Sequence, residues 1–184
     1  MTLHDDACEV LTAWASPNAG QEDLRRRYLA HLFGHPDAMW RGCHPDHLTA
    51  SVLIFSSDHS RVLLTLHKIA RRWLQTGGHC ESADPALSDA ALREGREESG
   101  ISNLLIDPSP VLLSRHAVPS CGPIRPSHHL DVQYIAVAPP GSKHLISDES
   151  DDLQWFGVDE LPVDTDTSVR ELTLAGVKRL REIP

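Results

Sequence analysis

Apolar side chains recur with two different periods along the chain, and the change of period divides it into segments. In the first 45 or so residues they recur every three or four positions, as on one face of a helix. A Ser-Pro-Asn break at residues 16–18 separates two such stripes. The stripes consist of Ala7, Val10, Leu11 and Trp14, and of Leu24, Tyr28, Leu29, Leu32 and Phe33. We therefore predict two N-terminal helices.

Short runs of aliphatic and β-branched residues follow and predict strands. Residues 49–55 and 61–66 flank a polar turn, which is typical of a hairpin. The longer run 129–137 begins by alternating and ends continuously apolar, as in a central strand with one end near solvent. Residues 111–113 and 153–156 predict two further strands.

Two more helices are predicted among and after these strands. Residues 85–99 have a helical pattern, with Asp84 as N-cap before a proline and Gly100 as left-handed C-cap. Ser168 and Glu171 have the spacing of a capping box at the start of the last helix. Helices alternating with strands predict an α/β fold.

Three glutamates of the helix predicted at 85–99 lie where solvation does not explain them. At about 100° per residue, Glu97 and Glu98 lie roughly 60° and 40° on either side of Glu94, on the arc that carries the apolar stripe. Like charges four residues apart destabilise a helix unless a cation or a basic partner offsets them. Several carboxylates favour a hard divalent cation, and ion pairs with Arg93 and Arg96 are the alternative.

These residues resemble the signature of the Nudix hydrolases. The segment 78–101 has a glycine, a spaced acid, Arg-Glu, two more glutamates, and a closing glycine plus aliphatic. It departs from the family pattern in three ways: Asp84 replaces a glutamate, eight residues rather than seven separate it from Arg93, and Gly95 replaces a larger aliphatic or alanine. The Trp-Phe and Leu-Pro pairs of residues 155–162 add weaker support.

The resemblance implies a Nudix-type α/β/α sandwich with a mixed sheet over residues 47–184. Residues 1–46 then form an N-terminal helical extension. We expect this extension to pack against the core or a second subunit, and a substrate-selecting cap is the alternative.

The resemblance also implies a hydrolase that cleaves the phosphoanhydride of a nucleoside diphosphate linked to another group, with Mg²⁺ or Mn²⁺ as cofactor. Arg93 is then expected to orient the carboxylates by hydrogen bonds. The general base is either a box glutamate or Glu149, whose alternative role is that of a solvated acid. The implied metal ligands are Glu94, Glu97, Glu98 and the carbonyl of Gly78.

Three further residues are candidates for substrate contacts. His129 and Asp131 share one face of the predicted central strand, which opens toward the expected cleft. Arg72 precedes the box and could meet phosphates. The alternatives are a polar surface for the first two and a solvated turn for Arg72.

Two other functions of the same fold remain open. A non-hydrolytic module that binds a nucleotide or an ADP-ribose-type ligand is supported by the altered spacing and by Gly95. An isomerase of isoprenoid diphosphates would need a catalytic cysteine and an acid suitably placed, which Cys80 and Cys121 do not establish. The hydrolase is favoured over the binding module because all three box glutamates are present.

Composition narrows the partners. The chain of 184 residues has a formal net charge of −9 and no polybasic surface, so we do not expect long nucleic acid as a partner. A small anionic substrate stays compatible with this charge, because a bound cation and local arginines can reverse the field inside one cleft. It has no run of about 18 apolar residues and no signal-peptide pattern, so we expect no membrane partner and a cytoplasmic protein. A homodimer is left open.

The cysteines and histidines give no standard metal motif. The four cysteines include no C-x-x-C pair, so we expect free thiols. Two groups could be imagined as zinc ligands, but neither has standard zinc spacing. They are Cys43 with His44 and His47, and Cys121 with His128 and His129.

Overall fold

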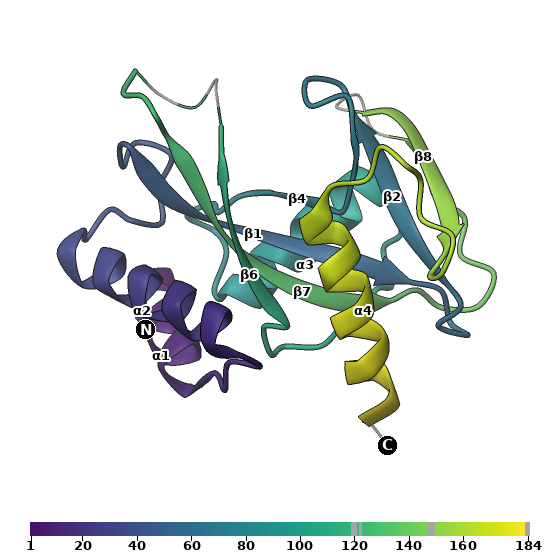
Figure 1. The fold of residues 1–184 in the computed structure, drawn as a ribbon, viewed down its shortest axis with the longest axis horizontal. Helices are drawn as coiled ribbons and strands as arrows, with labels where there is room; N and C mark the ends of the chain where they lie inside the picture. The colour runs from purple at the N-terminus through teal and green to yellow at the C-terminus, as the bar shows by residue number, and fades with distance from the viewer. Residues whose placement is uncertain (119–120, 122, 147–149, 183–184) are drawn as a thin grey trace.

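A computed structural model describes residues 1–118, 121, 123–146 and 150–182. Helices lie on both faces of a mixed sheet, with α4 in front of it and α3 behind it in Figure 1. The helices are α1 (Leu3–Ala13), α2 (Ala19–Gly34), α3 (Leu87–Ser99) and α4 (Thr167–Glu182). The strands are β1 (Asp46–Phe55), β2 (Arg61–His67), β3 (Trp73–Leu74), β4 (Thr76–His79), β5 (Leu105–Ile106), β6 (Leu112–Ala117), β7 (His128–Val137) and β8 (Ser150–Gly157). The predicted α/β sandwich with an N-terminal helical segment is confirmed.

Strand β1 is the centre of the sheet. It runs parallel to β7 along its whole length, from the pair Asp46 and His128 to the pair Phe55 and Val137. On its other side β1 pairs first with β4 and then, near its end, with β2. Strand β8 continues the sheet beyond β2, and β6 continues it beyond β7. This change of partner lets the β2–β8 and β6–β7 pairs diverge into two wings (Figure 1).

Successive side chains of β1 point to opposite faces, and the two faces differ in chemistry. Leu48, Ala50, Val52 and Ile54 belong to one apolar core, which includes residues of α1, α2 and α3. On the other face, Leu53 and Phe55 belong to a second core with residues of α4. The first half of that second face carries His47, Thr49 and Ser51 instead, all buried. The sheet therefore offers a polar surface beside the apolar contact with α4.

The two predicted N-terminal helices are present and pack on the sheet. Leu11 and Tyr28 are fully buried in the same core as β1 and β7. The side-chain amide of Gln21 connects α2 to β6 by two hydrogen bonds. Its NH₂ group donates to the carbonyl oxygen of Leu113 at 3.0 Å, and its oxygen accepts from the backbone N–H of Leu113 at 2.7 Å. Trp14 Nε1 donates to the carbonyl oxygen of Pro110 at 2.7 Å. These contacts give the segment a packing role.

The predicted N-cap of α3 is wrong. The helix begins at Leu87 with Ala86 as N-cap, and no side chain of the cap residue accepts a hydrogen bond. The backbone N–H of Leu87 donates instead to Asp6 of α1 at 2.8 Å, so a distant helix supplies the capping carboxylate. The predicted C-cap is confirmed, because Gly100 is left-handed with φ 69°.

Two other local predictions need correction. Helix α4 begins at Thr167, so Ser168 lies inside it, and the Ser168 N–H donates to Asp166 at 3.0 Å. Gly77 and Gly78 lie on strand β4 rather than in a loop, because their backbone pairs with Ser51 and Ala50 of β1.

Cys8, Cys43, Cys80 and Cys121 are free thiols. In the part of the chain that the structure describes, no helix has both the length and the apolar character needed to cross a bilayer.

Candidate active site

Strand β4 and helix α3 bring the box residues together, and two glycines allow their close approach. A Cβ atom at Gly78 would lie 2.7–2.9 Å from the carboxylate atoms of Glu94. A Cβ atom at Gly77 would lie 2.3 Å from the Cβ of Ser51 on β1. Any larger residue would push β4 away from either the helix or β1. The glycines therefore hold the Glu94 carboxylate directly against the backbone of β4.

Glu98 is held by the same strand. Its carboxylate accepts a hydrogen bond from the backbone N–H of Gly77 at 2.8 Å, and the residue is only 8 % exposed. A buried carboxylate needs such partners, because the loss of hydration is otherwise unfavourable. The prediction that Glu98 lies on the apolar arc of the helix is thus confirmed.

Arg93 is the centre of the hydrogen-bond network. It donates to both carboxylate oxygens of Asp84 at 3.0 Å, to Glu94 at 2.9 Å, to Glu97 at 3.1 Å and to the carbonyl oxygen of His79 at 2.9 Å. These hydrogen bonds, first that to Asp84 and then that to Glu94, raise the pKa of Arg93 above its ordinary value. The expected orienting role of Arg93 is supported by this geometry.

Asp84 has a role different from capping. It is 7 % exposed, receives the two-pronged contact from Arg93, and also accepts from the backbone N–H of Glu81 at 2.7 Å. A paired contact of this kind fixes the plane of the guanidinium. The extra residue between Asp84 and Arg93 does not prevent this pairing.

The charge of the network fits a cation. Arg93 pairs with the carboxylates of Asp84, Glu94 and Glu97, and the carboxylate of Glu98 is held on the neighbouring backbone of β4. Taken formally, these five side chains carry four negative charges and one positive charge. The side chain of Glu97 is 59 % exposed and that of Glu94 is 14 % exposed, so the cluster reaches solvent. Carboxylate oxygens open to water suit a hard divalent cation that keeps part of its hydration shell.

Gly95, the departure from the family pattern, has a packing reason. A Cβ atom there would lie 2.6 Å from Val52 Cγ1 of β1 and 3.3 Å from Leu104 Cδ1. At this point helix α3 lies too close to β1 to leave room for a larger side chain. Packing therefore explains Gly95, which no longer supports a non-hydrolytic protein.

We expect Gly95→Ala to lower the free energy of unfolding by about 1–3 kcal/mol, because the methyl group overpacks the contact with Val52. Urea unfolding measures this change. Gly34→Ala in α2, where no atom lies within 4 Å of the new Cβ, is the matched control and should be neutral or stabilising. Equal effects of the two changes would contradict the packing account.

His129 and Asp131 lie on the same face of β7, as expected, and both side chains are engaged within the protein. Asp131 is 3 % exposed and accepts hydrogen bonds from Thr49 Oγ1 at 3.0 Å and Ser51 Oγ at 2.7 Å. Its carboxylate thus anchors the polar half of the sheet face. His129 lies in a cluster of imidazoles and a thiol, described below.

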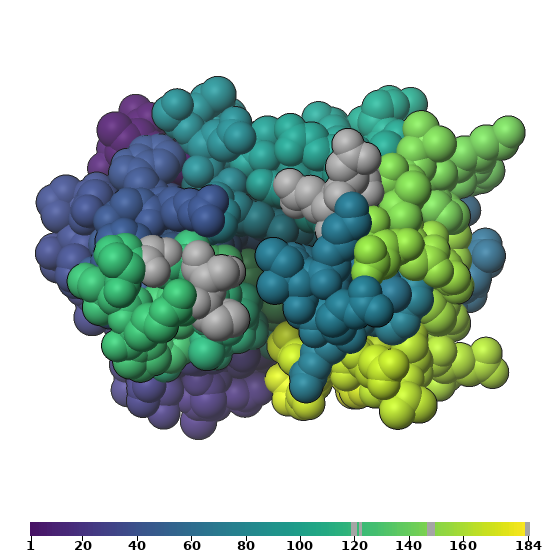
Figure 2. Space-filling view, turned by 90° about the horizontal axis from the view of Figure 1, so that it is seen from above, coloured from purple at the N-terminus to yellow at the C-terminus, as the bar shows by residue number. Residues whose placement is uncertain are grey.

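Arg72 and Glu149 are the remaining predicted residues. Arg72 is in the connection between β2 and β3, where it forms an exposed ion pair with Asp166 at 3.1 Å. Glu149 lies outside the residues that the structure describes. The surface is hollowed between the green ends of β6 and β7 and the blue connection between β2 and β3, with the teal β4–α3 segment beside it (Figure 2). Arg72 and the box thus belong to segments that border the same hollow.

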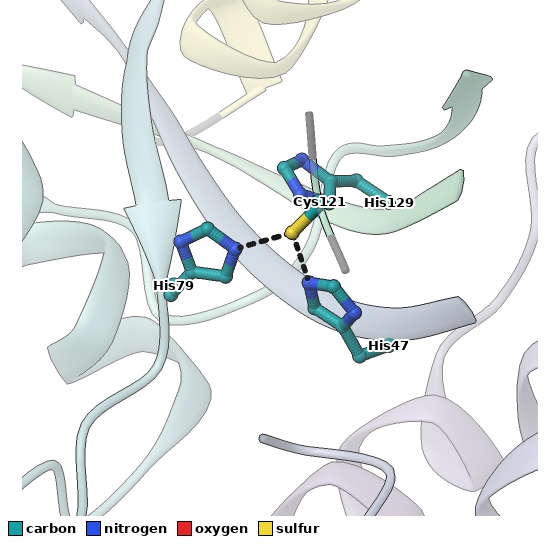
Figure 3. Close-up of side chains that lie close together, drawn as sticks. All are labelled: His47, His79, Cys121 and His129. Atoms are coloured by element: carbon teal, nitrogen blue, oxygen red, sulfur yellow. Dashed lines mark hydrogen bonds between the residues drawn. The ribbon is translucent and has the colours of Figure 1, made fainter. Parts of the chain in front are cut away.

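A group of histidines and one cysteine was not recognised as a unit in the sequence. His47, His79, His129 and Cys121 each offer one ligand atom, and these atoms all lie within 4.8 Å of one another (Figure 3). From the sequence, His47 was grouped with Cys43, whereas Cys121 and His129 formed a second group. The parallel register of β1 and β7 places His47 opposite His129, and the pairing of β4 with β1 adds His79. Only this topology, which spacing along the chain does not reveal, could have identified the group.

Cys80 is unsuited to act as a nucleophile. Burial is the main reason why its thiol has a pKa raised to about 12, and the Asp84 carboxylate adds to it. A thiol with that pKa stays protonated at neutral pH. This weakens the reading of the chain as an isomerase that uses Cys80.

Comparisons with known proteins agree with this geometry. The model of the NUDIX domain matches residues 45–175. A NUDIX-family hydrolase from Clostridium perfringens is 23 % identical, with a TM-score of 0.61 over 73 % of this chain and 97 % of that one. An Ap4A hydrolase from C. elegans, solved as a binary complex, is 16 % identical, with a TM-score of 0.61 over 73 % and 97 %. The NUDIX domain of NrtR from Shewanella oneidensis, complexed with ADP ribose, is 19 % identical, with a TM-score of 0.56 over 72 % and 87 %. A comparison with curated protein sequences gives no match.

Proposed function

Because the chain belongs to the Nudix hydrolase family, we propose that it cleaves the phosphoanhydride of a nucleoside diphosphate linked to another group, with Mg²⁺ or Mn²⁺ as cofactor. The observation that carries this proposal is the cluster of Glu94, Glu97 and Glu98 around Arg93 and the backbone of β4. All three glutamates of the family signature are present in this chain.

The residues that would hold the cation are Glu94, Glu97, Glu98 and the carbonyl oxygen of Gly78. The Glu94 carboxylate lies directly against the backbone of Gly78, which supports their joint role as ligands of one ion. When bound, a divalent cation there supplies neutralisation of the phosphate oxygens and lowers the pKa of an attacking water. Arg93 keeps the carboxylates of Glu94 and Glu97 oriented.

The diphosphate is proposed to lie in the hollow beside the box. The β2–β3 connection, which carries Arg72, borders this hollow (Figure 2). Arg72 is exposed and its partner Asp166 is also partly exposed, so a phosphate could replace that carboxylate at small cost. Asp131 is proposed to act through Thr49 and Ser51, whose hydroxyl groups it fixes on the polar face of the sheet.

Glu149 remains our proposed general base besides the box glutamates. Glu149→Gln is expected to lower kcat by about 100-fold, the contribution typical of general base catalysis, with little change in stability. The pH dependence of kcat measures this. Since Glu149 precedes the exposed Asp151, Asp151→Asn is a local control for the loss of one negative charge. Equal kinetics in the Glu149 variant and wild type would leave a box glutamate as the base.

A non-hydrolytic binding module has less support than it had from the sequence. Its two arguments were the altered spacing before Arg93 and the presence of Gly95. Asp84 pairs with Arg93 despite the spacing, and Gly95 is explained by the contact with Val52. No observation in the described part of the chain favours this function over hydrolysis.

The substrate class can be identified with a panel of nucleoside diphosphate derivatives. It should include Ap4A and ADP ribose, because these molecules are named for two similar structures. Products are measured by coupled phosphate release and by chromatography, with Mg²⁺ or Mn²⁺. We expect turnover of at least one member, and tight binding of a member without any turnover would favour the binding module.

A further inference from the structure

Four side chains from distant parts of the sequence converge at one end of the sheet. His47 comes from β1, His79 from β4 and His129 from β7, and Cys121 comes from the segment that precedes β7. Figure 3 shows the three imidazoles around the sulfur atom of Cys121. Three imidazole nitrogens and one thiol are a ligand set typical of zinc.

The distances are those of a nearly assembled tetrahedron. Cys121 Sγ lies 3.5 Å from His47 Nε2 and 3.5 Å from His79 Nε2. Zinc bonds of about 2.0–2.1 Å to nitrogen and 2.3 Å to sulfur place tetrahedral ligand atoms about 3.5 Å apart. All four ligand atoms lie within 4.8 Å of one another, so closure needs a movement of only about 1 Å in the widest pair.

Hydrogen bonds within the protein account for only part of the arrangement. Cys121 can donate its one hydrogen atom to one imidazole and accept from the N–H of the other, so hydrogen bonds account for these two contacts. His129 Nε2 is buried and has no hydrogen-bond partner among the described residues. Buried polar atoms without partners are uncommon and call for an explanation, for which a bound ion is a standard one.

One ligand is already held in the required tautomer. His47 Nδ1 donates to the carbonyl oxygen of Cys43 at 3.3 Å, because a carbonyl can only accept. The lone pair of His47 then lies on Nε2, which is the atom that faces Cys121. A backbone carbonyl on the outer nitrogen is the usual way in which proteins orient a metal-binding histidine.

The three imidazole rings of the cluster also lie close to one another. The ring centroids of His47, His79 and His129 lie 5.0–5.1 Å from one another. The three rings therefore lie close enough together for one nitrogen of each to approach a common ion.

We propose that His47, His79, His129 and Cys121 together bind one zinc ion in a closed, structural site. Four protein ligands complete a tetrahedral shell and leave no position for a substrate, which distinguishes this site from the carboxylates of the box. The ion ties β1, β4 and β7 to the segment that carries Cys121. Neither sequence motif nor family signature contains these four residues as a set.

The zinc site also supports the active site through one residue. The carbonyl oxygen of His79 accepts a hydrogen bond from Arg93 at 2.9 Å, and Gly78 precedes it on β4. Fixing the His79 imidazole therefore fixes the part of β4 against which Glu94 lies. His79 is the one residue of the segment 78–101 in the proposed zinc site, and the box glutamates are not among its ligands.

Cobalt substitution tests the proposal directly. Purified full-length protein is titrated with Co²⁺ in excess Mg²⁺, which competes for the carboxylates of the box. We expect one Co²⁺ per chain, visible bands of tetrahedral cobalt and a near-ultraviolet band from a thiolate–cobalt bond. Cys121→Ser should lose the thiolate band and at least about a hundredfold in affinity. Cys8→Ser is the matched control, since Cys8 also lies 3.8 Å from a histidine nitrogen but outside the cluster.

Wild-type protein alone provides a second test, which does not depend on the folding of a variant. X-ray absorption at the zinc edge of the zinc-loaded protein should show three nitrogen ligands and one sulfur ligand. Zinc should also raise the midpoint of thermal unfolding. A shell without sulfur, the absence of stoichiometric binding, or a thiolate band that persists in Cys121→Ser would overturn the proposal. The Glu97→Gln variant should retain its zinc. Zinc binding can therefore be confirmed even if the hydrolase proposal fails.

Discussion

Glu97→Gln is expected to lower Mg²⁺-dependent turnover about a thousandfold while the fold stays intact. The side chain of Glu97 is 59 % exposed, so an amide of the same shape changes little in packing. Losing one anionic oxygen ligand removes charge stabilisation of about 4 kcal/mol, which corresponds to that loss of rate. Steady-state kinetics at saturating substrate, combined with urea unfolding, measure both quantities.

Glu171→Gln is the matched control for this change. Glu171 is an exposed helical glutamate of α4, outside the box, and its replacement should leave turnover unchanged. Glu98→Gln should lose activity like Glu97→Gln, because its amide oxygen still accepts from the Gly77 N–H while the negative charge is gone. Full activity in both box variants would contradict the assignment of these glutamates as metal ligands.

Arg93→Met is expected to lower the free energy of unfolding by about 3 kcal/mol and to abolish measurable turnover. The side chain of Asp84 is only 5 % exposed, so removal of the guanidinium leaves a buried carboxylate without its basic partner. The same change releases Glu94 and Glu97 from their orienting hydrogen bonds. Urea unfolding at constant pH gives the stability, and the metal dependence of kcat/KM gives the effect on the site.

Two variants separate this network from surface electrostatics. Arg26→Met removes an exposed arginine that pairs with Glu22 at 3.0 Å, and it should cost less than about 1 kcal/mol. Combining Arg93→Met with Asp84→Asn should recover part of the stability but not the activity, because the buried charge is removed while the box stays unoriented. A stability loss in Arg93→Met as small as in Arg26→Met would show that the pair with Asp84 is not a buried contact.

Much of the fold could be predicted because its helices and strands are determined by residues that are close together in the sequence. The spacing of apolar residues indicated α1, α2 and the hairpin of β1 and β2, and Gly100 marked the end of α3. The arc of Glu94, Glu97 and Glu98 required only the period of a helix. These features depend on neighbours in sequence, for which propensity and periodicity are informative.

The features that failed depend on residues far apart. Asp84 resembles an N-cap, but its carboxylate is engaged by Arg93, while Asp6 of α1 accepts from the first turn of α3. A local rule cannot decide between a cap and a buried ion pair, because the outcome depends on which tertiary partner is available. From the sequence, Gly95 supported a non-hydrolytic protein. The structure explains it by packing, because Val52 of β1 leaves no room for a side chain at this position.

The histidine and cysteine cluster shows the same limit. Standard zinc motifs place ligands close together in the sequence, and the shortest separation here is eight residues, from Cys121 to His129. The ligands instead meet through pairing between strands, with β4 and β7 on either side of β1. Strand register, which the sequence does not state, brings them together.

The most direct test of the account is the Mg²⁺ dependence of hydrolysis of the best panel substrate, for wild type and Glu97→Gln. Both proteins should hold their zinc, and Mg²⁺ should be withheld and then restored rather than removed by a chelator that would also take the zinc. We predict that turnover of wild type rises from background to saturation with Mg²⁺ and that Glu97→Gln stays near background. Turnover without Mg²⁺, or equal Mg²⁺ activation of both proteins, would contradict a catalytic cation held by the box glutamates.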